Sequence, residues 1–183
     1  LTQNNSPYTV FTPYKNNHLK KIFNEGITQF DCDHYKVNLS KFKYKPLQSL
    51  KEIGFEKSNI SSMNLPLGTQ GGITLIKDFK TRIKNYNHNR NFPGVKGVSY
   101  LSVHNRFGTV SIRHLAKIAL ENDSEGSSTW LNELIWRDFY FQILSNFPHI
   151  EDGKAFKFKY NNLKFENDEK KFNAWINGQT GFP

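Results

Sequence analysis

The chain has 183 residues, which predicts a single domain, and its 25 Lys and Arg against 16 Asp and Glu give a net charge of +9. No run of about 18 apolar residues exists, which excludes a membrane-spanning helix, and the single cysteine excludes an internal disulfide. The positive charge favours a nucleic acid as partner, or an anionic lipid surface as second choice. A codon bias toward Asn and Lys explains the charge equally well.

The first part of the chain has little regular periodicity. Tyr8–Thr12 is aromatic and β-branched between two prolines, which predicts a short strand. Lys15–Phe23 is basic and of helical character. Residues 24–70 mix Lys, Ser, Asn and Pro without a sustained period, which indicates a linker that crosses a surface.

Helical periodicity begins after Gly71 and Gly72, and the predicted elements then follow in order. They are a helix over 73–86, a loop over 87–97, a helix over 112–121 capped by Ser111, a loop over 123–128, a helix from Ser128 or Thr129 to about Asn146, and a helix over 168–176. The fold class is therefore mainly α, with one strand at the start.

The long helix carries two stripes at helical spacing. Its core face consists of Leu131, Leu134, Ile135 and Phe139. The second stripe consists of Trp130, Glu133, Trp136, Arg137 and Tyr140. This stripe is either a second packing face, with Glu133 and Arg137 as an i,i+4 pair, or a cleft wall that stacks a planar ligand and hydrogen-bonds its edge.

Two other segments have residue types that bind ligands. The loop Gly97–Ser102 offers two serines and backbone amides to phosphate oxygens, although plain turns have the same composition. Asp31–His34 contains metal-ligand types, but the spacing is too tight for one tetrahedral site and no second cluster exists. We therefore predict no metal site.

Five segments together resemble the DNA photolyase and cryptochrome family, in the family's order. They are Tyr8–Pro13, the Tyr-x-x-x-Arg-Asn-Phe-Pro block at 86–93, the block from Val98 to Arg113, the Trp-x-x-Glu-Leu-x-Trp-Arg-x-Phe-Tyr helix at 130–140, and the Trp-x-x-Gly-x-Thr-Gly-x-Pro turn at 175–183. The chain looks most like a bacterial cyclobutane pyrimidine dimer (deoxyribodipyrimidine) photolyase, a carbon–carbon lyase.

The resemblance implies non-covalent FAD and light-driven repair of pyrimidine dimers in DNA by an electron from reduced flavin. It implies catalytic roles for Glu133, which hydrogen-bonds the flipped dimer, and Trp136, on which the dimer stacks. The implied cofactor-binding positions are Tyr86, Val98, Ser99, Tyr100, Leu101, Ser102, Trp130 and Glu133. The implied positions for binding UV-damaged DNA are Arg90, Glu133, Trp136, Arg137 and Tyr140. A buried flavin requires the dimer to leave the base stack, so a receiving ring is expected.

Several positions depart from the family's pattern. Val98 replaces a threonine, Tyr100 replaces an arginine, and Asn105 replaces an apolar residue. Phe165 lies about where relatives carry the surface tryptophan of an electron-transfer chain. Photoreduction of the flavin would then need another route, for which Tyr160 is a candidate.

The chain starts without methionine and stops after a Gly-rich turn, so we expect a piece of a longer parent protein. Residues 1–14 would end an α/β antenna domain, 15–70 would be the interdomain linker, and 71–183 would be the first half of the helical FAD-binding domain. The isolated piece is then expected to be inactive and to retain FAD weakly. The parent would be a cytoplasmic bacterial protein, with an antenna chromophore of folate or deazaflavin type in its missing part and no membrane or obligate protein partner.

Three alternatives stay open. A cryptochrome is a flavin photoreceptor that repairs nothing, although Glu133 and Trp136 favour repair. Specificity for the (6-4) photoproduct is disfavoured by the Glu133–Trp136 block. A basic helical DNA-binding module without flavin is the simplest alternative.

Overall fold

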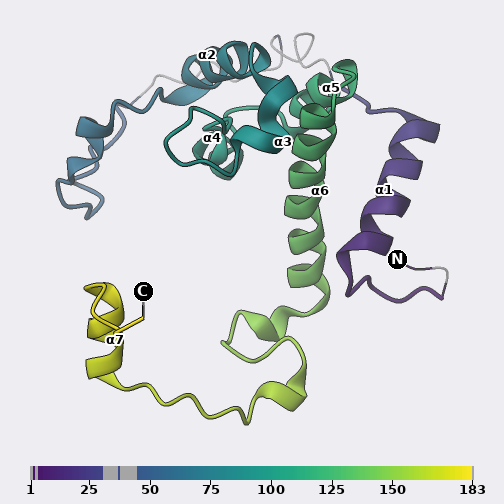
Figure 1. The fold of residues 1–183 in the computed structure, drawn as a ribbon. Helices are drawn as coiled ribbons and strands as arrows, with labels where there is room; N and C mark the ends of the chain where they lie inside the picture. Colours follow the sequence, from purple (N-terminus) through teal and green to yellow (C-terminus); the bar gives the residue numbers. More distant parts are fainter. Residues whose placement is uncertain (1, 3, 31–36, 38–44, 183) are drawn as a thin grey trace. The chain divides into compact units, whose positions relative to one another are not determined.

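The computed structural model describes residues 2, 4–30, 37 and 45–182, and the regular elements of that part are helical (Figure 1). In chain order they are α1 (Phe11–Glu25), η2 (Asn59–Met63), α2 (Gly68–Lys80), η3 (Ile83–Asn85), α3 (Tyr86–Asn89), α4 (Ser102–Phe107), α5 (Ile112–Glu121), α6 (Glu125–Asn146), η4 (Pro148–Ile150), η5 (Phe158–Tyr160) and α7 (Glu169–Ile176). The predicted mainly α fold class is confirmed. The Asp31–His34 segment lies outside the described residues.

The chain divides into two compact units, Tyr8–Phe139 and a smaller one made of Leu1–Pro7 with Tyr140–Pro183. The core lies in the larger unit, where apolar side chains from α2, η3, α3, α5, α6 and the residue before α4 are buried together. Its members are Ile76, Phe79, Ile83, Tyr86, Leu101, Leu115, Ile118, Ala119, Trp130, Leu131, Leu134 and Ile135.

Helix α6 has the predicted core face, since Leu131, Leu134, Ile135 and Phe139 are all buried. It begins at Glu125, three residues before the predicted start at Ser128. The reason is a reciprocal cap: the Ser127 N–H donates to Ser124 Oγ at 3.1 Å, and the Ser124 N–H donates to Ser127 Oγ at 3.3 Å. This pair satisfies two of the free amides at the helix start.

Helix α2 also begins earlier than predicted. It starts at Gly68, so Gly71 and Gly72 lie inside the helix. A Cβ on Gly71 would lie 2.4 Å from the carbonyl carbon of Pro66, and one on Gly72 would lie 2.4 Å from Cγ1 of Val110. Glycine is therefore needed here for close packing. The helix stops at Lys80, where the Thr81 hydroxyl donates to the Asp78 carbonyl at 2.7 Å and competes with helical hydrogen bonding.

The strand predicted over Tyr8–Thr12 is wrong, because Phe11 and Thr12 form the first turn of α1. Pro13 is tolerated there, since the first turn of a helix needs no amide donor from that residue. The β-favouring composition is overridden by packing, because Phe11 and Tyr14 lie against the core of the larger unit.

The helix predicted over Ile112–Glu121 is confirmed as α5, and the Ser111 hydroxyl accepts a hydrogen bond from the His114 N–H at 3.4 Å. The predicted helix over 73–86 is divided into the end of α2, η3 and the start of α3, and α3 extends into the predicted loop. The short helix α4 was not predicted.

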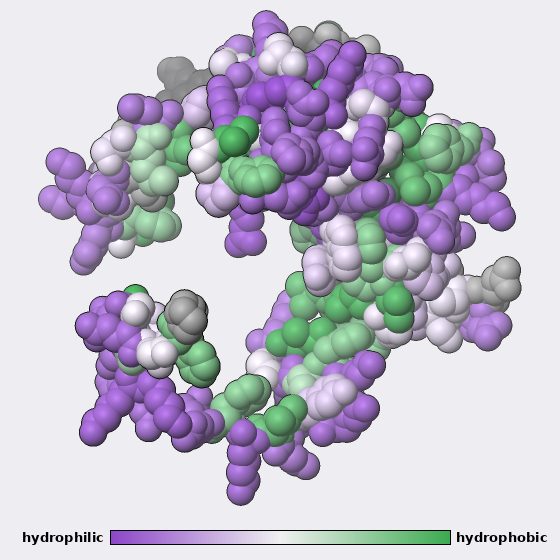
Figure 2. Space-filling view, in the orientation of Figure 1, coloured by the Kyte–Doolittle hydropathy of each residue, from purple (hydrophilic) through white to green (hydrophobic). Residues whose placement is uncertain are grey.

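The smaller unit contains the end of α6, η4, η5 and α7. The helix predicted over 168–176 is confirmed as α7 (Glu169–Ile176). Asp168 caps it, with its carboxylate accepting a hydrogen bond from the Lys171 N–H at 3.0 Å. Many of the unit's large apolar side chains are exposed, among them Phe165 and Trp175. Figure 2 shows apolar residues at the surface along α6 as well.

Within the described part of the chain, no helix has the length and apolar character that crossing a bilayer requires.

Candidate functional site

A wall of buried aromatic rings lies where α6 meets α2 and α3. The Trp130 and Phe79 ring centroids are 4.8 Å apart, and Phe79 meets Tyr86 edge-on at 5.7 Å. Trp130 is only 4% exposed and Tyr86 only 7%. Burial raises the pKa of the Tyr86 phenol. Trp130 and Tyr86 are two of the predicted cofactor-binding residues, and they lie 44 positions apart in the chain. The fold brings both into one aromatic cluster through Phe79.

An ion pair lies in front of this wall. Arg90 Nη1 is 2.5 Å from Glu133 Oε1, and the guanidinium carbon lies 5.4 Å from the centre of the Tyr86 ring. The hydrogen bond to Glu133 raises the pKa of Arg90. Both side chains are about one-third exposed, so the pair faces solvent on one side. The structure therefore pairs Glu133 with Arg90, which the sequence did not suggest.

Trp136 stacks on a residue that sequence reasoning did not consider as part of the site. Its ring lies 3.5 Å from that of Phe11 in α1, with 7° between the planes, and it meets Phe139 edge-on at 5.7 Å. Phe11 comes from the segment that was predicted as a strand. One face of the Trp136 ring is thus covered by α1.

Arg137 joins α6 to α4. Its Nη2 donates to the Asn105 carbonyl at 3.3 Å. The side-chain oxygen Oδ1 of Asn105 is buried and has no hydrogen-bond partner. An unsatisfied buried acceptor next to an arginine is a place where a donor group of a ligand would gain a hydrogen bond.

The loop Gly97–Ser102 is held from behind by Arg82. Its Nη1 donates to the carbonyls of Lys96 at 2.9 Å and Val98 at 2.7 Å. Tyr100 has φ +58°, an uncommon conformation for a residue with a bulky side chain. Such strain is often retained at ligand sites, where the surrounding structure enforces it.

The side chains of this loop differ in what they offer to a ligand. Leu101 is buried in the core, whereas Val98 and Tyr100 are 40% and 47% exposed. Ser102 is exposed at the start of α4, and Ser99 Oγ accepts a hydrogen bond from the Leu101 N–H at 3.4 Å. Serine hydroxyls at a helix start suit phosphate oxygens chemically.

Asp78 ties this loop to α2. Its carboxylate accepts from Lys96 Nζ and from Arg82 Nη2, each at 2.9 Å. The hydrogen bonds from Lys96 and then from Arg82 lower the pKa of Asp78 below its ordinary value. A lowered pKa in the folded state stabilises the fold above the unfolded-state pKa, and that stability disappears as the pH falls through the folded-state pKa.

We therefore expect Asp78→Asn to lower the free energy of unfolding at neutral pH. The difference from the unchanged protein should vanish in acid, at a pH below the lowered folded-state pKa of Asp78, where the carboxylate is protonated in both states. Urea unfolding at both pH values measures this. Asp123→Asn, on the exposed loop before α6, is the control. An Asp78→Asn effect that persists undiminished in acid would contradict the proposed ion-pair origin.

Tyr140 belongs to the smaller unit and is 62% exposed. The larger unit brings together Tyr86, Arg90 and Glu133 by direct contact, and Trp130 joins this cluster through the ring of Phe79. Sequence reasoning missed α1 as the neighbour of Trp136, and the only available signal was the run of aromatic residues from Tyr8 to Tyr14.

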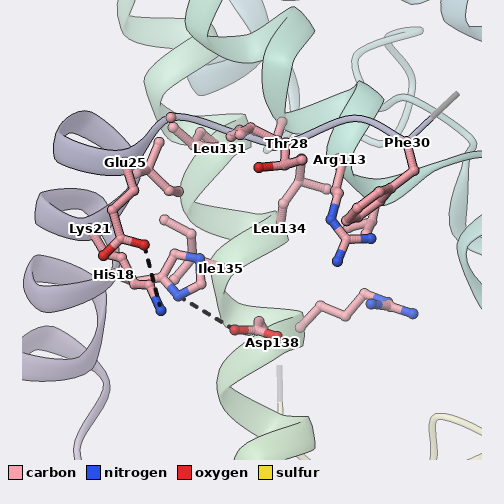
Figure 3. A pocket seen from close by; sticks show the side chains of 16 residues that line it. His18, Lys21, Glu25, Thr28, Phe30, Arg113, Leu131, Leu134, Ile135 and Asp138 are labelled. Carbon is pink, nitrogen blue, oxygen red and sulfur yellow. Dashed lines mark ion pairs between the residues drawn. The ribbon is translucent and has the colours of Figure 1, made fainter.

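A groove of about 690 Å³ lies between α1, α5 and α6 (Figure 3). Arg113 lies 5.5 Å from the centre of the Phe30 ring on its wall. Arg137 is the one sequence-predicted site residue among its lining residues. The groove is therefore a different surface from the one that Tyr86 and Glu133 share. Among the described residues, no group of three or more His, Cys, Asp or Glu is placed to hold a metal ion.

Comparison with protein families matches residues 130–183 to the FAD binding domain of DNA photolyase. The deoxyribodipyrimidine photo-lyase of Escherichia coli K12 is 29% identical over 189 residues, covering 100% of this chain and 39% of that protein. The enzyme of the same name from Alkalihalophilus pseudofirmus is 30% identical over 192 residues, covering 100% of this chain and 38% of that protein. The one from Neurospora crassa is 34% identical over 137 residues, covering 70% of this chain and 22% of that protein. This chain thus spans between about one-fifth and two-fifths of the length of these relatives.

Proposed function

This chain belongs to the DNA photolyase and cryptochrome family, and we propose that the whole protein repairs cyclobutane pyrimidine dimers in DNA under blue light. The observation that carries the proposal is the placement of Glu133 and Trp136 on α6. Glu133 stands beside Arg90 at the solvent-facing side of the aromatic wall, and Trp136 follows within one helical turn.

The cofactor of the proposal is FAD, which when bound and reduced supplies an electron to the damaged bases under light. The residues present fit such a group in two respects. The loop with Ser99 and Ser102 offers hydroxyls, and Asn105 Oδ1 is a buried acceptor without a partner. Trp130 and Leu101 are buried in the core, so we assign them the role of packing beneath the residues that would contact FAD.

The DNA-binding part of the proposal rests on cations and rings. Arg90 and Arg137 would contact phosphates, and the net charge of +9 would add affinity that does not depend on sequence. Glu133 would hydrogen-bond the flipped dimer, with Trp136 as the stacking ring and Tyr140 as a further contact. The cytoplasm of a bacterium is the proposed location.

The second candidate is a cryptochrome, a photoreceptor without repair activity. The observation that favours it is the contact of Trp136 with Phe11, which covers one of the two ring faces on which a dimer would stack. Repair then depends on the opposite face. The two candidates share the flavin and differ in the fate of damaged DNA.

Light-dependent repair separates them. The whole protein, with UV-irradiated oligo(dT) under reducing conditions, should restore the thymine absorbance in blue light and leave it unchanged in the dark. Bound, photoreducible flavin without recovery would favour the cryptochrome. Absence of flavin would favour a plain DNA-binding module.

We expect Glu133→Gln to lower the repair yield severalfold with little loss of affinity for damaged DNA. The amide is isosteric but removes the charge and the ion pair with Arg90. Glu125→Gln, an exposed carboxylate at the start of the same helix, is the matched control and should repair normally. Unchanged repair by Glu133→Gln would contradict the assigned role.

A further inference from the structure

A continuous series of aromatic contacts connects Trp136 to α1. Trp136 meets Phe139 at 5.7 Å between ring centroids, and Phe139 meets Tyr14 at 5.3 Å. Tyr14 in turn meets Tyr8 edge-on at 5.6 Å. One buried ring therefore separates an oxidisable indole from an oxidisable phenol, and the phenylalanine between them is not itself easily oxidised.

The phenol of Tyr14 has a base at its hydroxyl. Its O–H donates to Oδ2 of Asp138 on α6, and His18 Nδ1 lies 3.4 Å from the same oxygen. Figure 3 shows His18 and Asp138 turned toward each other across the end of the groove. Burial, and next the hydrogen bond to Asp138, raise the pKa of Tyr14, so the phenol is protonated at neutral pH. A protonated phenol can lose an electron readily only if its proton leaves at the same time, and Asp138 is in contact to receive it.

We propose that Tyr14 is a redox-active tyrosine that returns an electron to Trp136 after that indole has been oxidised. One electron passes from Tyr14 to the indole radical cation. The phenol O–H bond breaks, and its proton moves to Oδ2 of Asp138. The products are an intact Trp136, a neutral phenoxyl radical on Tyr14 and a protonated Asp138, whose carboxyl is half-exposed and releases the proton to water.

The step needs a one-electron oxidant for Trp136. Within the proposed function this oxidant is the photoexcited, fully oxidised flavin, and to that extent the biological use of the site rests on the proposed function. The site itself does not, because any one-electron oxidant that selects indoles starts the same reaction. A negative result in a radiolysis experiment would not contradict the proposed DNA repair. A negative repair assay would likewise not contradict electron transfer from Tyr14 to Trp136.

Pulse radiolysis with the azide radical supplies such an oxidant without flavin. The protein has three tryptophans, of which Trp130 is 4% exposed and Trp175 is 68% exposed. All variants therefore carry Trp175→Phe, which leaves half-buried Trp136 as the accessible indole. We expect the indolyl absorption to decay while the phenoxyl absorption rises with the same rate constant, independently of protein concentration.

Three variants test the assignment. Tyr14→Phe should abolish the concentration-independent phenoxyl rise. Asp138→Asn keeps a hydrogen-bond acceptor but not a base, and should slow the rise roughly a hundredfold, the low end of what a positioned proton acceptor contributes. Tyr140→Phe, which removes a tyrosine from the same helix as Trp136, should leave the rate unchanged.

The opposite pattern would overturn the proposal. Loss of the rise in Tyr140→Phe with persistence in Tyr14→Phe would place the electron donor elsewhere. An unchanged rate in Asp138→Asn would show that the carboxylate takes no proton. Circular dichroism of each variant, compared with the parent sequence, separates these outcomes from loss of fold.

Discussion

Replacing Gly126 with alanine should lower the free energy of unfolding by about 3 kcal/mol, the upper part of the range for overpacking a filled interior. A Cβ at this position would lie 2.2 Å from the Ile83 carbonyl oxygen and 2.4 Å from that of Lys84. Both atoms belong to backbone, so neither can swing away as a flexible side chain would. The first turn of α6 would have to move from η3, and the wall formed by Trp130 would move with it.

The sign of this effect is opposite to the usual one, because glycine to alanine inside a helix ordinarily stabilises it by about 0.5–1 kcal/mol. Urea unfolding followed by tryptophan fluorescence measures the change. Gly94→Ala is the control, since a Cβ there meets nothing within 4 Å. Equal stability of Gly126→Ala and the unchanged protein would show that α6 and η3 are not packed as closely as described.

Trp136→Ala should weaken the binding of damaged DNA by the whole protein roughly ten- to a hundredfold, because stacking of a base on an aromatic ring contributes about 1–3 kcal/mol. Binding of FAD should change little, since the ring stacks on Phe11 of α1 and the proposed hydroxyl contacts to FAD come from the loop over 97–102. Titration with a dimer-containing oligonucleotide and, separately, with flavin gives the two affinities.

Trp175→Ala is the matched control, because it removes an exposed tryptophan from the smaller unit. It should leave both affinities unchanged. Equal losses of DNA and flavin affinity in Trp136→Ala would contradict the separation of roles. Trp136→Phe should recover part of the DNA affinity, since a smaller ring still stacks.

Sequence reasoning succeeded where structure is decided locally. The helix over Ile112–Glu121 follows from its own cap at Ser111 and its own apolar spacing. The core face of α6 follows in the same way from residues three and four apart. These features need no information about what packs against them.

It failed where distant parts of the chain meet. Arg90 reaches Glu133 across 43 positions and Phe11 reaches Trp136 across 125, and no period in the sequence encodes either contact. The same holds for Gly71 and Gly72, which look like a helix boundary until Pro66 and Val110 are known to lie against them. The family resemblance supplied the residue roles, but the partners of those residues came from the structure.

The Arg90–Glu133 pair makes two binding events depend on each other. A phosphate that takes Arg90 must compete with a carboxylate already in place, and a ligand that takes Glu133 releases the guanidinium. Thermodynamic coupling of this kind is reciprocal, so whichever group is engaged first raises the affinity of the other for its own ligand. Under the proposed function, undamaged DNA would offer its phosphates to an arginine that is already paired with a carboxylate. A lesion that occupied Glu133 would free the Arg90 guanidinium beside it, so the proposed lesion contact would itself favour damaged over undamaged strands.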